Sequence, residues 1–273
     1  MSGRVRVDYI GHVAHLRLSR PQRLNAIDSQ LIDELLQAGQ RLRTTPGLRA
    51  VVVSGDGRGF CSGLDLDAIR PGDDTAARPR IDIDRQIHGA ANAAQHAVLQ
   101  WRELPVPVIA AIHGFALGGG LQLPLGMDVR IVHPDTRMGL LEVKWGLIPD
   151  MAGVYLLRGL LRHDALAELM YSARQFDGRE ACALGICTRL SDDPLSTAMD
   201  LAQQIAANSP DAVRAAKQLL HLGEYPDAAR ILPAEAASQR ALLGTPNQRE
   251  AVAAGIGKRK PVFVDMPAQE QTP

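Results

Sequence analysis

Two glycine-containing segments carry the residue types that could hold a negatively charged oxygen. One runs from His113 into the triple glycine Gly118–Gly120, and the other is Gly59-Phe60-Cys61-Ser62-Gly63-Leu64-Asp65-Leu66. Glycine has no Cβ, so a ligand oxygen can approach the main chain closely. Free N–H groups at the start of a helix also stabilise negative charge. Because an oxyanion hole needs converging N–H donors, two such corners together predict one.

The elements that must position these corners can be read from the apolar pattern. Each corner follows a buried-type strand, at Arg49–Ser54 and at Val106–Ile112, and a helix is expected to begin at Leu121–Leu125. Residues 4–10 and 13–18 alternate as a hairpin, and Asp28 is expected to cap a helix. Further elements are expected as a helix at Ile87–Leu104, short strands at Asp128–His133 and Arg137–Leu141, and helices from about residue 152 onward. This alternation favours an α/β fold with parallel strands, and the polar segment 69–85 is expected to be a loop over the site.

Composition excludes several classes of protein. The 273 residues include 30 basic and 30 acidic side chains, which gives no global field for nucleic acid or a membrane surface. Aromatic residues make up only 4%, too few for a base-stacking platform. Three cysteines without a pairing pattern favour a reducing, cytoplasmic compartment and argue against a zinc site. No signal peptide and no membrane-spanning stretch are expected.

Both corners, in this order, resemble the crotonase (enoyl-CoA hydratase/isomerase) family. Other segments resemble it in the same order, and the match extends from about residue 4 to residue 264. These segments are Arg20-Pro21 with Leu24-Asn25-Ala26-Ile27, Gly139-Leu140-Leu141-Glu142 with Gly146-Leu147-Ile148-Pro149, Ala181–Gly185 before Ile186-Cys187, Gln248–Ala251, and Lys258–Phe263.

The resemblance implies a crotonase-like spiral of repeated ββα units over residues 1–200. It further implies a helical C-terminal region, residues 201–273, that forms a homotrimer or a hexamer (a dimer of trimers) and completes the CoA site. The implied ligand is an acyl-CoA thioester, as in fatty acid metabolism. No metal and no cofactor are implied, because CoA is part of the substrate.

The resemblance also assigns catalytic roles to residues of this sequence. By position in the motif, the backbone N–H groups of Ser62 and Gly119 would hold the thioester oxygen, and losing one such donor costs about 3 kcal/mol of barrier. Glu142 would be the acid/base that moves a proton at the substrate carbon chain. The alternative for Glu142 is an ion pair with Lys144.

Two positions depart from the hydratases of this family. Gln122 stands where those enzymes carry a second glutamate, and a glutamine cannot exchange a proton at neutral pH. Asp150 stands where most of them carry glycine. Its position resembles an acid/base of dienoyl-CoA isomerases and the nucleophilic aspartate of 4-chlorobenzoyl-CoA dehalogenases. An N-cap for the helix that follows is an equally open interpretation of Asp150.

Substrate-binding residues are also implied by the resemblance. Arg23 and Lys258 are expected near the CoA phosphates, and Gly63 and Leu64 belong to the stretch that binds adenine through its main chain. Asp65 is in the same stretch, although an aspartate at such a position is more often an N-cap for the helix that follows. The remaining implied contacts are Leu24, Ala26, Gly118 and Gln122.

Double-bond isomerisation of an enoyl-CoA or dienoyl-CoA fits this residue set best. Hydration is an alternative in which Gln122 would orient the water. Substitution with Asp150 as nucleophile is another, and His96 is the only candidate for its base. A non-catalytic acyl-CoA-binding protein on the same fold is the remaining alternative.

Overall fold

The computed structural model describes residues 3–68, 82–208, 210–221, 228–259 and 261. Most of the expected loop 69–85 and residues 260 and 262–263 of the C-terminal motif therefore lie outside the described residues. The chain forms an α/β fold around a six-stranded sheet with the order β1-β2-β3-β6-β8-β10.

The sheet is parallel except at one edge. There β1 (Val5–Ile10) and β2 (Val13–Leu18) pair antiparallel, which confirms the expected hairpin. The strands β3 (Ala50–Gly55), β6 (Val108–Ile112), β8 (Val129–Val132) and β10 (Arg189–Leu190) then follow in parallel. The expected parallel α/β sheet is confirmed.

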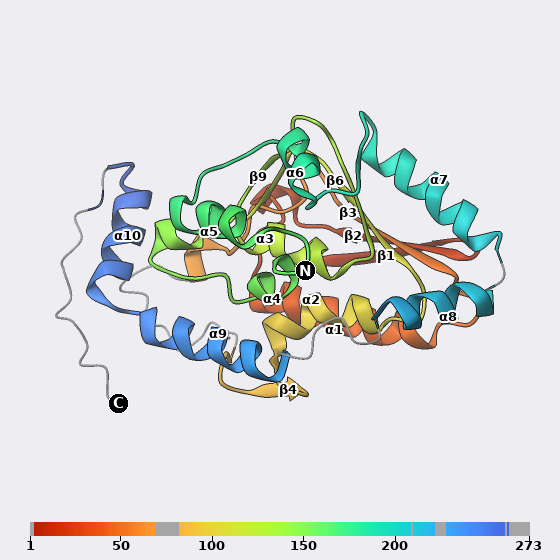
Figure 1. Cartoon of the computed structure of the whole chain (residues 1–273), viewed down its shortest axis with the longest axis horizontal. Helices are drawn as coiled ribbons and strands as arrows, with labels where there is room; N and C mark the ends of the chain where they lie inside the picture. Colours follow the sequence, from red (N-terminus) through yellow and green to blue (C-terminus); the bar gives the residue numbers. More distant parts are fainter. Residues whose placement is uncertain (1–2, 69–81, 209, 222–227, 260, 262–273) are drawn as a thin grey trace.

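Helices cover both faces of this sheet because its central strands are apolar on both sides. Val52, Ile109 and Ile131 pack toward α7 (Pro194–Ala206), which presents buried alanines four residues apart at 198, 202 and 206. The opposite face belongs to the larger core, which includes α1 (Ser29–Thr44) and α2 (Ala93–Glu103). Figure 1 shows α7 on one side of the strands and α1 and α2 on the other.

Both glycine corners lead from the main sheet into a second, smaller layer. In it, β7 (Phe115–Leu117) pairs in parallel with β9 (Arg137–Gly139), and Cys61 forms a parallel bridge with Ala116. The second corner then begins the four-residue helix α3 (Gly119–Gln122). The expected helix at Leu121–Leu125 therefore starts earlier, and it continues only as a 3₁₀ turn, η3 (Leu123–Gly126), at the proline that cannot donate a helical hydrogen bond.

The expected helix at Ile87–Leu104 is wrong in its first turns. Residues 86–92 form a small hairpin of β4 (Gln86–His88) and β5 (Ala91–Asn92), with Gly89 at φ +57° between the strands. Asn92 then caps α2 by a capping box with Gln95. The cap fixes the helix start at Ala93. By contrast, Asp28 caps α1 as expected, with its side chain accepting from the Leu31 N–H.

Helices α9 and α10 reach the loop after β9, where Glu142 lies. That loop contains the 3₁₀ turn η4 (Glu142–Trp145) and ends in α4 (Gly153–Leu157); α9 (Ala228–Leu242) contacts α4, and α10 (Pro246–Ile256) packs on η4. The remaining elements are η1 (Pro21–Arg23), η2 (Leu66–Ala68), α5 (His163–Ser172), α6 (Gly178–Leu184) and α8 (Pro210–His221). In Figure 1, α9 and α10 extend at the end of the molecule opposite α7 and α8. Among the described helices, none combines the length and the apolar character needed to cross a bilayer.

Candidate active site

The two glycine corners pack against each other through their backbones. The Leu117 N–H donates to the Cys61 carbonyl at 3.1 Å. A Cβ on Gly120 would lie 2.3 Å from the Cys61 carbonyl oxygen, and a Cβ on Gly63 would lie 2.5 Å from the Leu117 carbonyl oxygen. Neither position has room for any other residue type, so the glycines hold the two corners at backbone contact.

The amide groups of these corners are not equally available. The Ser62 N–H donates to the Leu24 carbonyl at 3.1 Å, so the prediction that Ser62 supplies a free donor is wrong. Within the described residues, the amides of Leu64 and Gly119 have no hydrogen-bond acceptor. A Cβ on Gly63 would lie 3.6 Å from the Gly119 nitrogen, so the residue that precedes Leu64 is close to the Gly119 amide. The sequence motif does not reveal this, because the hydrogen bond between the Ser62 N–H and Leu24 joins segments that are far apart in the chain.

Glu142 is the first residue of η4 and lies next to the second corner. One of its oxygens, Oε1, accepts a 2.7 Å hydrogen bond from Gln122 Nε2. A Cβ on Gly118 would lie 3.3 Å from the same oxygen, so this glycine leaves the carboxylate open to the corner. The other oxygen, Oε2, is buried and has no partner among the described residues. The alternative pairing with Lys144 is not formed, and Oε2 is the atom free to accept or deliver a proton.

Gln122 is fully buried and its amide has one possible orientation. Its Oε1 accepts the Met151 and Gly153 N–H groups, both at 3.0 Å, and backbone N–H groups can only donate. Nε2 must therefore donate to Glu142. Gln122 thus caps the start of α4 from outside the helix. The interpretation of Asp150 as N-cap is wrong, because Ala152 occupies that place at φ +62° and no side chain on the cap residue bonds the helix.

Asp150 lies in the same loop as Glu142, but the helix that contacts this part of the loop is α9. Gln239, which is 6% exposed on α9, lies beside the Asp150 carboxylate and lowers its pKa. The same side chain accepts the Ile148 N–H through Oε1 at 3.3 Å. Gln239 does not stand out in the sequence. No local signal marks a glutamine in a C-terminal helix as a partner of residue 150.

Burial changes the protonation of both carboxylates. It raises the pKa of Glu142 to about 7; the nearby Asp150 charge adds to this, and the hydrogen bond from Gln122 opposes it. Burial likewise raises the pKa of Asp150 to about 6, opposed by the hydrogen bond from Gln239. General acid–base catalysis is most effective when the pKa lies near the working pH. The loop therefore offers two carboxylates that can gain or lose a proton near neutrality.

The residues expected to bind CoA are largely engaged with one another. Asp65 accepts hydrogen bonds from Arg20 at 2.7 Å and from Arg23 at 2.9 Å, and Arg23 also pairs with Asp67. The Asp65 carboxylate further accepts the Asp67 N–H at the start of η2, so the capping interpretation is confirmed. Contacts of this region with CoA stay predictions, as do those of Leu24, an exposed residue, and Ala26, a buried one.

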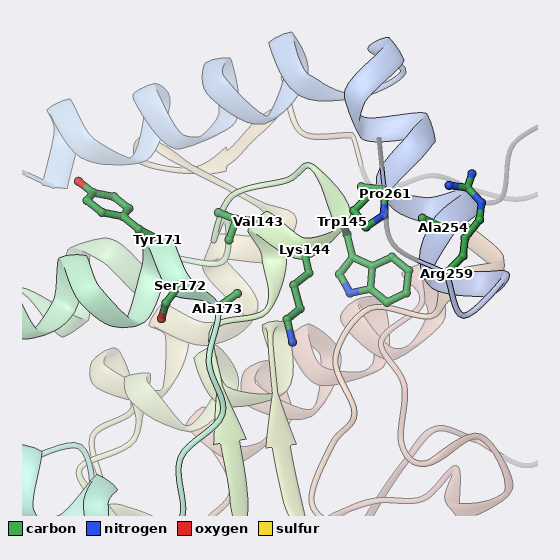
Figure 2. A pocket seen from close by; sticks show the side chains of 11 residues that line it. Val143, Lys144, Trp145, Tyr171, Ser172, Ala173, Ala254, Arg259 and Pro261 are labelled. Carbon is green, nitrogen blue, oxygen red and sulfur yellow. The ribbon is translucent and has the colours of Figure 1, made fainter. Parts of the chain in front are cut away.

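A hollow of about 400 Å³ lies next to η4, on the residues that follow Glu142 (Figure 2). It is lined by η4, by the end of α5 and by α10, where Gly255 leaves space for the Trp145 ring. Glu142 and Asp150 do not line it. Trp145 is therefore a wall of this hollow and a contact of α10. Lys258 follows α10 at φ +50°, and its expected role at CoA phosphates stays a prediction.

His96 belongs to a separate cluster on α2. Its ring stacks on that of His88 with centroids 4.2 Å apart and planes 19° from parallel, and His88 pairs with Glu103 at 3.0 Å. These three are the one group of potential metal ligands found within the described ranges. In-plane lone pairs of nearly parallel rings do not meet at one point, so we assign no metal to the cluster.

Comparison with known proteins identifies the family of the chain. The family model described as enoyl-CoA hydratase/isomerase matches residues 10–266. An enoyl-CoA isomerase/hydratase of Mycosarcoma maydis is 33% identical, with 92% of each chain covered. A peroxisomal Delta(3,5)-Delta(2,4)-dienoyl-CoA isomerase of Arabidopsis thaliana is 30% identical, with 93% of each covered. A crystal structure of an enoyl-CoA hydratase/isomerase from Pseudoalteromonas atlantica T6c matches with a TM-score of 0.82 and 25% identity, over 96% of this chain and 100% of the other.

Proposed function

Because the chain belongs to the enoyl-CoA hydratase/isomerase family, we propose that it moves the double bond of an enoyl-CoA or dienoyl-CoA thioester through an enolate. The amides of Leu64 and Gly119 hold the thioester oxygen. Glu142 and Asp150 move the proton. This assignment replaces Ser62 by Leu64 in the oxyanion hole, since the Ser62 amide donates to Leu24, whereas the Leu64 amide has no acceptor among the described residues.

The proposed reaction is a proton shift without net gain or loss of atoms. The unpartnered Oε2 of Glu142 takes a proton from the carbon next to the thioester, and the electron pair of that C–H bond delocalises onto the thioester oxygen. Two amide donors stabilise the resulting charge where it develops. The electrons then return through the chain, and a proton is delivered to the far end of the shifted double bond by Glu142 or Asp150.

One observation carries the choice of isomerisation: the acid/base pair is Glu142 with Asp150, and residue 122 is a glutamine committed to α4. Hydration as the family performs it uses a second carboxylate at position 122. Here the Gln122 carbonyl oxygen accepts two backbone N–H groups and its amide donates to Glu142. Position 122 therefore supports the geometry of Glu142 without exchanging a proton.

Proton exchange with deuterated solvent tests the proposal directly. Purified protein is expected to incorporate deuterium at the thioester α-carbon of 3-enoyl- and dienoyl-CoA substrates and to yield isomers of unchanged composition. Glu142→Gln is expected to lower this exchange by about 10²–10⁴-fold, the usual contribution of a general base. Glu168→Gln, an exposed glutamate on α5, is the matched control and should leave the rate unchanged.

The outcome that overturns the proposal is equally specific. Absence of exchange across enoyl-, dienoyl- and aryl-CoA thioesters, together with a raised Tm in their presence, would assign the protein as an acyl-CoA binder instead. Hydration is the second candidate, favoured by the name of the Mycosarcoma maydis relative, an isomerase/hydratase. A product that has gained one water, seen by mass spectrometry, would identify it.

A further inference from the structure

We propose that Gln239 on α9 is the positioning residue of Asp150, so that the acid/base pair is complete only when this C-terminal helix is docked. The inference rests on the proposed function in one respect, namely that Asp150 takes part in proton transfer. Its structural content can be tested without turnover.

The orientation of the Gln239 amide is determined by its contact with the Ile148 backbone. Gln239 is buried, and its Oε1 accepts the Ile148 N–H at 3.3 Å. Since a backbone N–H can only donate, Oε1 is the acceptor and Nε2 is left to donate. Asp150 is two residues beyond Ile148, and the Gln239 side chain lowers the pKa of its carboxylate. One side chain thus holds the backbone of the short segment that carries Asp150.

Helix α9 is fixed to the core on the same helical face. Leu232, Ala236 and Gln239 are buried at spacings of four and three residues, which places them on one side of the helix. Gln95 of α2 donates to the Leu232 carbonyl at 2.9 Å in a buried hydrogen bond. Two turns of helix therefore connect an anchor on α2 with the contact at Ile148.

The Gln239 side chain also affects the protonation of Asp150. An amide donor favours the ionised form of a partly buried carboxylate, because it replaces part of the lost hydration. Without Gln239, only the hydrogen bond from its own backbone would oppose the effect of burial on the pKa of Asp150, and the segment that carries Asp150 would lose its contact with α9. The first effect moves the titration of Asp150 to higher pH, and the second removes the fixed placement that proton transfer needs.

Carboxyl ¹³C NMR of aspartate-labelled protein tests this directly, with Asp150→Asn to assign the Asp150 signal. Gln239→Leu removes the donor and should raise the pKa of Asp150 by about one unit. Gln239→Glu keeps an acceptor for Ile148 but places a second carboxylate at Asp150, so it should raise the pKa at least as far. It also serves as the second variant if Gln239→Leu does not fold. Gln100→Leu, which removes a buried glutamine bonded to Leu35 on α1, is the matched control.

An unchanged Asp150 titration in both folded Gln239 variants would overturn the proposal. Kinetics supply the second readout: the Gln239→Leu substitution should lower kcat with little change in KM and shift the pH profile upward. In the Asp150→Asn background it should change kcat less than about twofold, since coupled residues are not additive. If the protein has no turnover at all, the NMR titration still decides the role of Gln239, so the two failures are distinguishable.

Discussion

The surroundings of Glu142 and those of Asp150 each contain a buried glutamine, but the two glutamines come from different regions of the chain. In each, a buried glutamine accepts backbone N–H through its oxygen. Gln122 also donates its amide to Glu142, whereas Gln239 lies beside Asp150 and lowers the pKa of its carboxylate. For Glu142 the glutamine is Gln122, in the short helix that follows the second glycine corner. For Asp150 it is Gln239, more than a hundred residues further along and on a C-terminal helix.

The different origins of Gln122 and Gln239 show which part of the site depends on which part of the fold. Gln122 is fixed by the same spiral that forms the glycine corners, so Glu142 is positioned whenever the core is folded. Asp150 additionally needs α9. The two carboxylates should therefore respond differently to changes in the core and in the C-terminal region.

The largest effect is expected for Gln122→Leu. This change leaves the buried Met151 and Gly153 N–H groups without an acceptor and removes the donor to Glu142. Each orphaned donor costs about 1–3 kcal/mol, so we expect the free energy of unfolding to fall by about 2–4 kcal/mol. Urea unfolding measures it, and Gln239→Leu, which frees only Ile148, should lose less. Equal losses would contradict the comparison.

Asp150→Asn should separate the two titrations. We expect about a 10²-fold loss of deuterium exchange, together with loss of the step near pH 6 that belongs to Asp150. The pKa of Glu142 should fall below about 7, because burial still raises it but the Asp150 charge no longer adds to that effect. A pH profile of the remaining exchange reports both. A Glu142 titration that stays in place would mean that the two groups are not coupled.

The sequence predicted those parts of the site that local pattern determines. The hairpin, the cap at Asp28, the strands that lead into the corners and the glycines at 118–120 all follow from short-range chemistry. The fold class and the family followed from motifs in the correct order. Glu142 and Asp150 were identified by position, and the structure places both in one loop beside the corners.

The parts that the sequence did not predict depend on contacts between distant segments. The motif predicts Ser62 as an oxyanion donor, and nothing local shows that the Ser62 amide pairs with Leu24. Asp150 resembled a helix cap, yet Gln122 satisfies the N–H groups there. From the sequence, Gln122 is a residue that cannot exchange a proton but could orient a water molecule. Its two acceptor contacts exist only in the folded chain. Gln239 had no sequence signal at all.

Gln122→Glu tests whether residue 122 limits the reaction. The new carboxylate can still accept the Met151 and Gly153 N–H groups through one oxygen, so the fold should be kept. Its second oxygen would face Glu142 and supply the missing second acid/base. We therefore expect a gain in water addition, seen as hydrated product, and a pKa of Glu142 shifted upward by the like charge. No gain would show that residue 122 does not limit hydration.

The smallest effect concerns stability and follows from the raised pKa of Glu142. Its folded-state pKa of about 7 exceeds the ordinary value of 4.5, so the folded state binds the extra proton between these two pH values. Stability is therefore lost as the pH rises through this window, and the full penalty is present above about 7. Removing the ionisable group by Glu142→Gln should abolish about 1–2 kcal/mol of this pH dependence, discounted because the side chain is only partly buried.

Urea unfolding of wild type and Glu142→Gln at about pH 5 and about pH 8 measures this contribution. Any cost of placing a neutral amide next to Gln122 is the same at both pH values, so it cancels in the difference between the two proteins. The variant should gain on the wild type as the pH rises. Parallel pH dependence in the two proteins would mean that Glu142 titrates at its ordinary value, and the case for a base poised near neutrality would be lost with it.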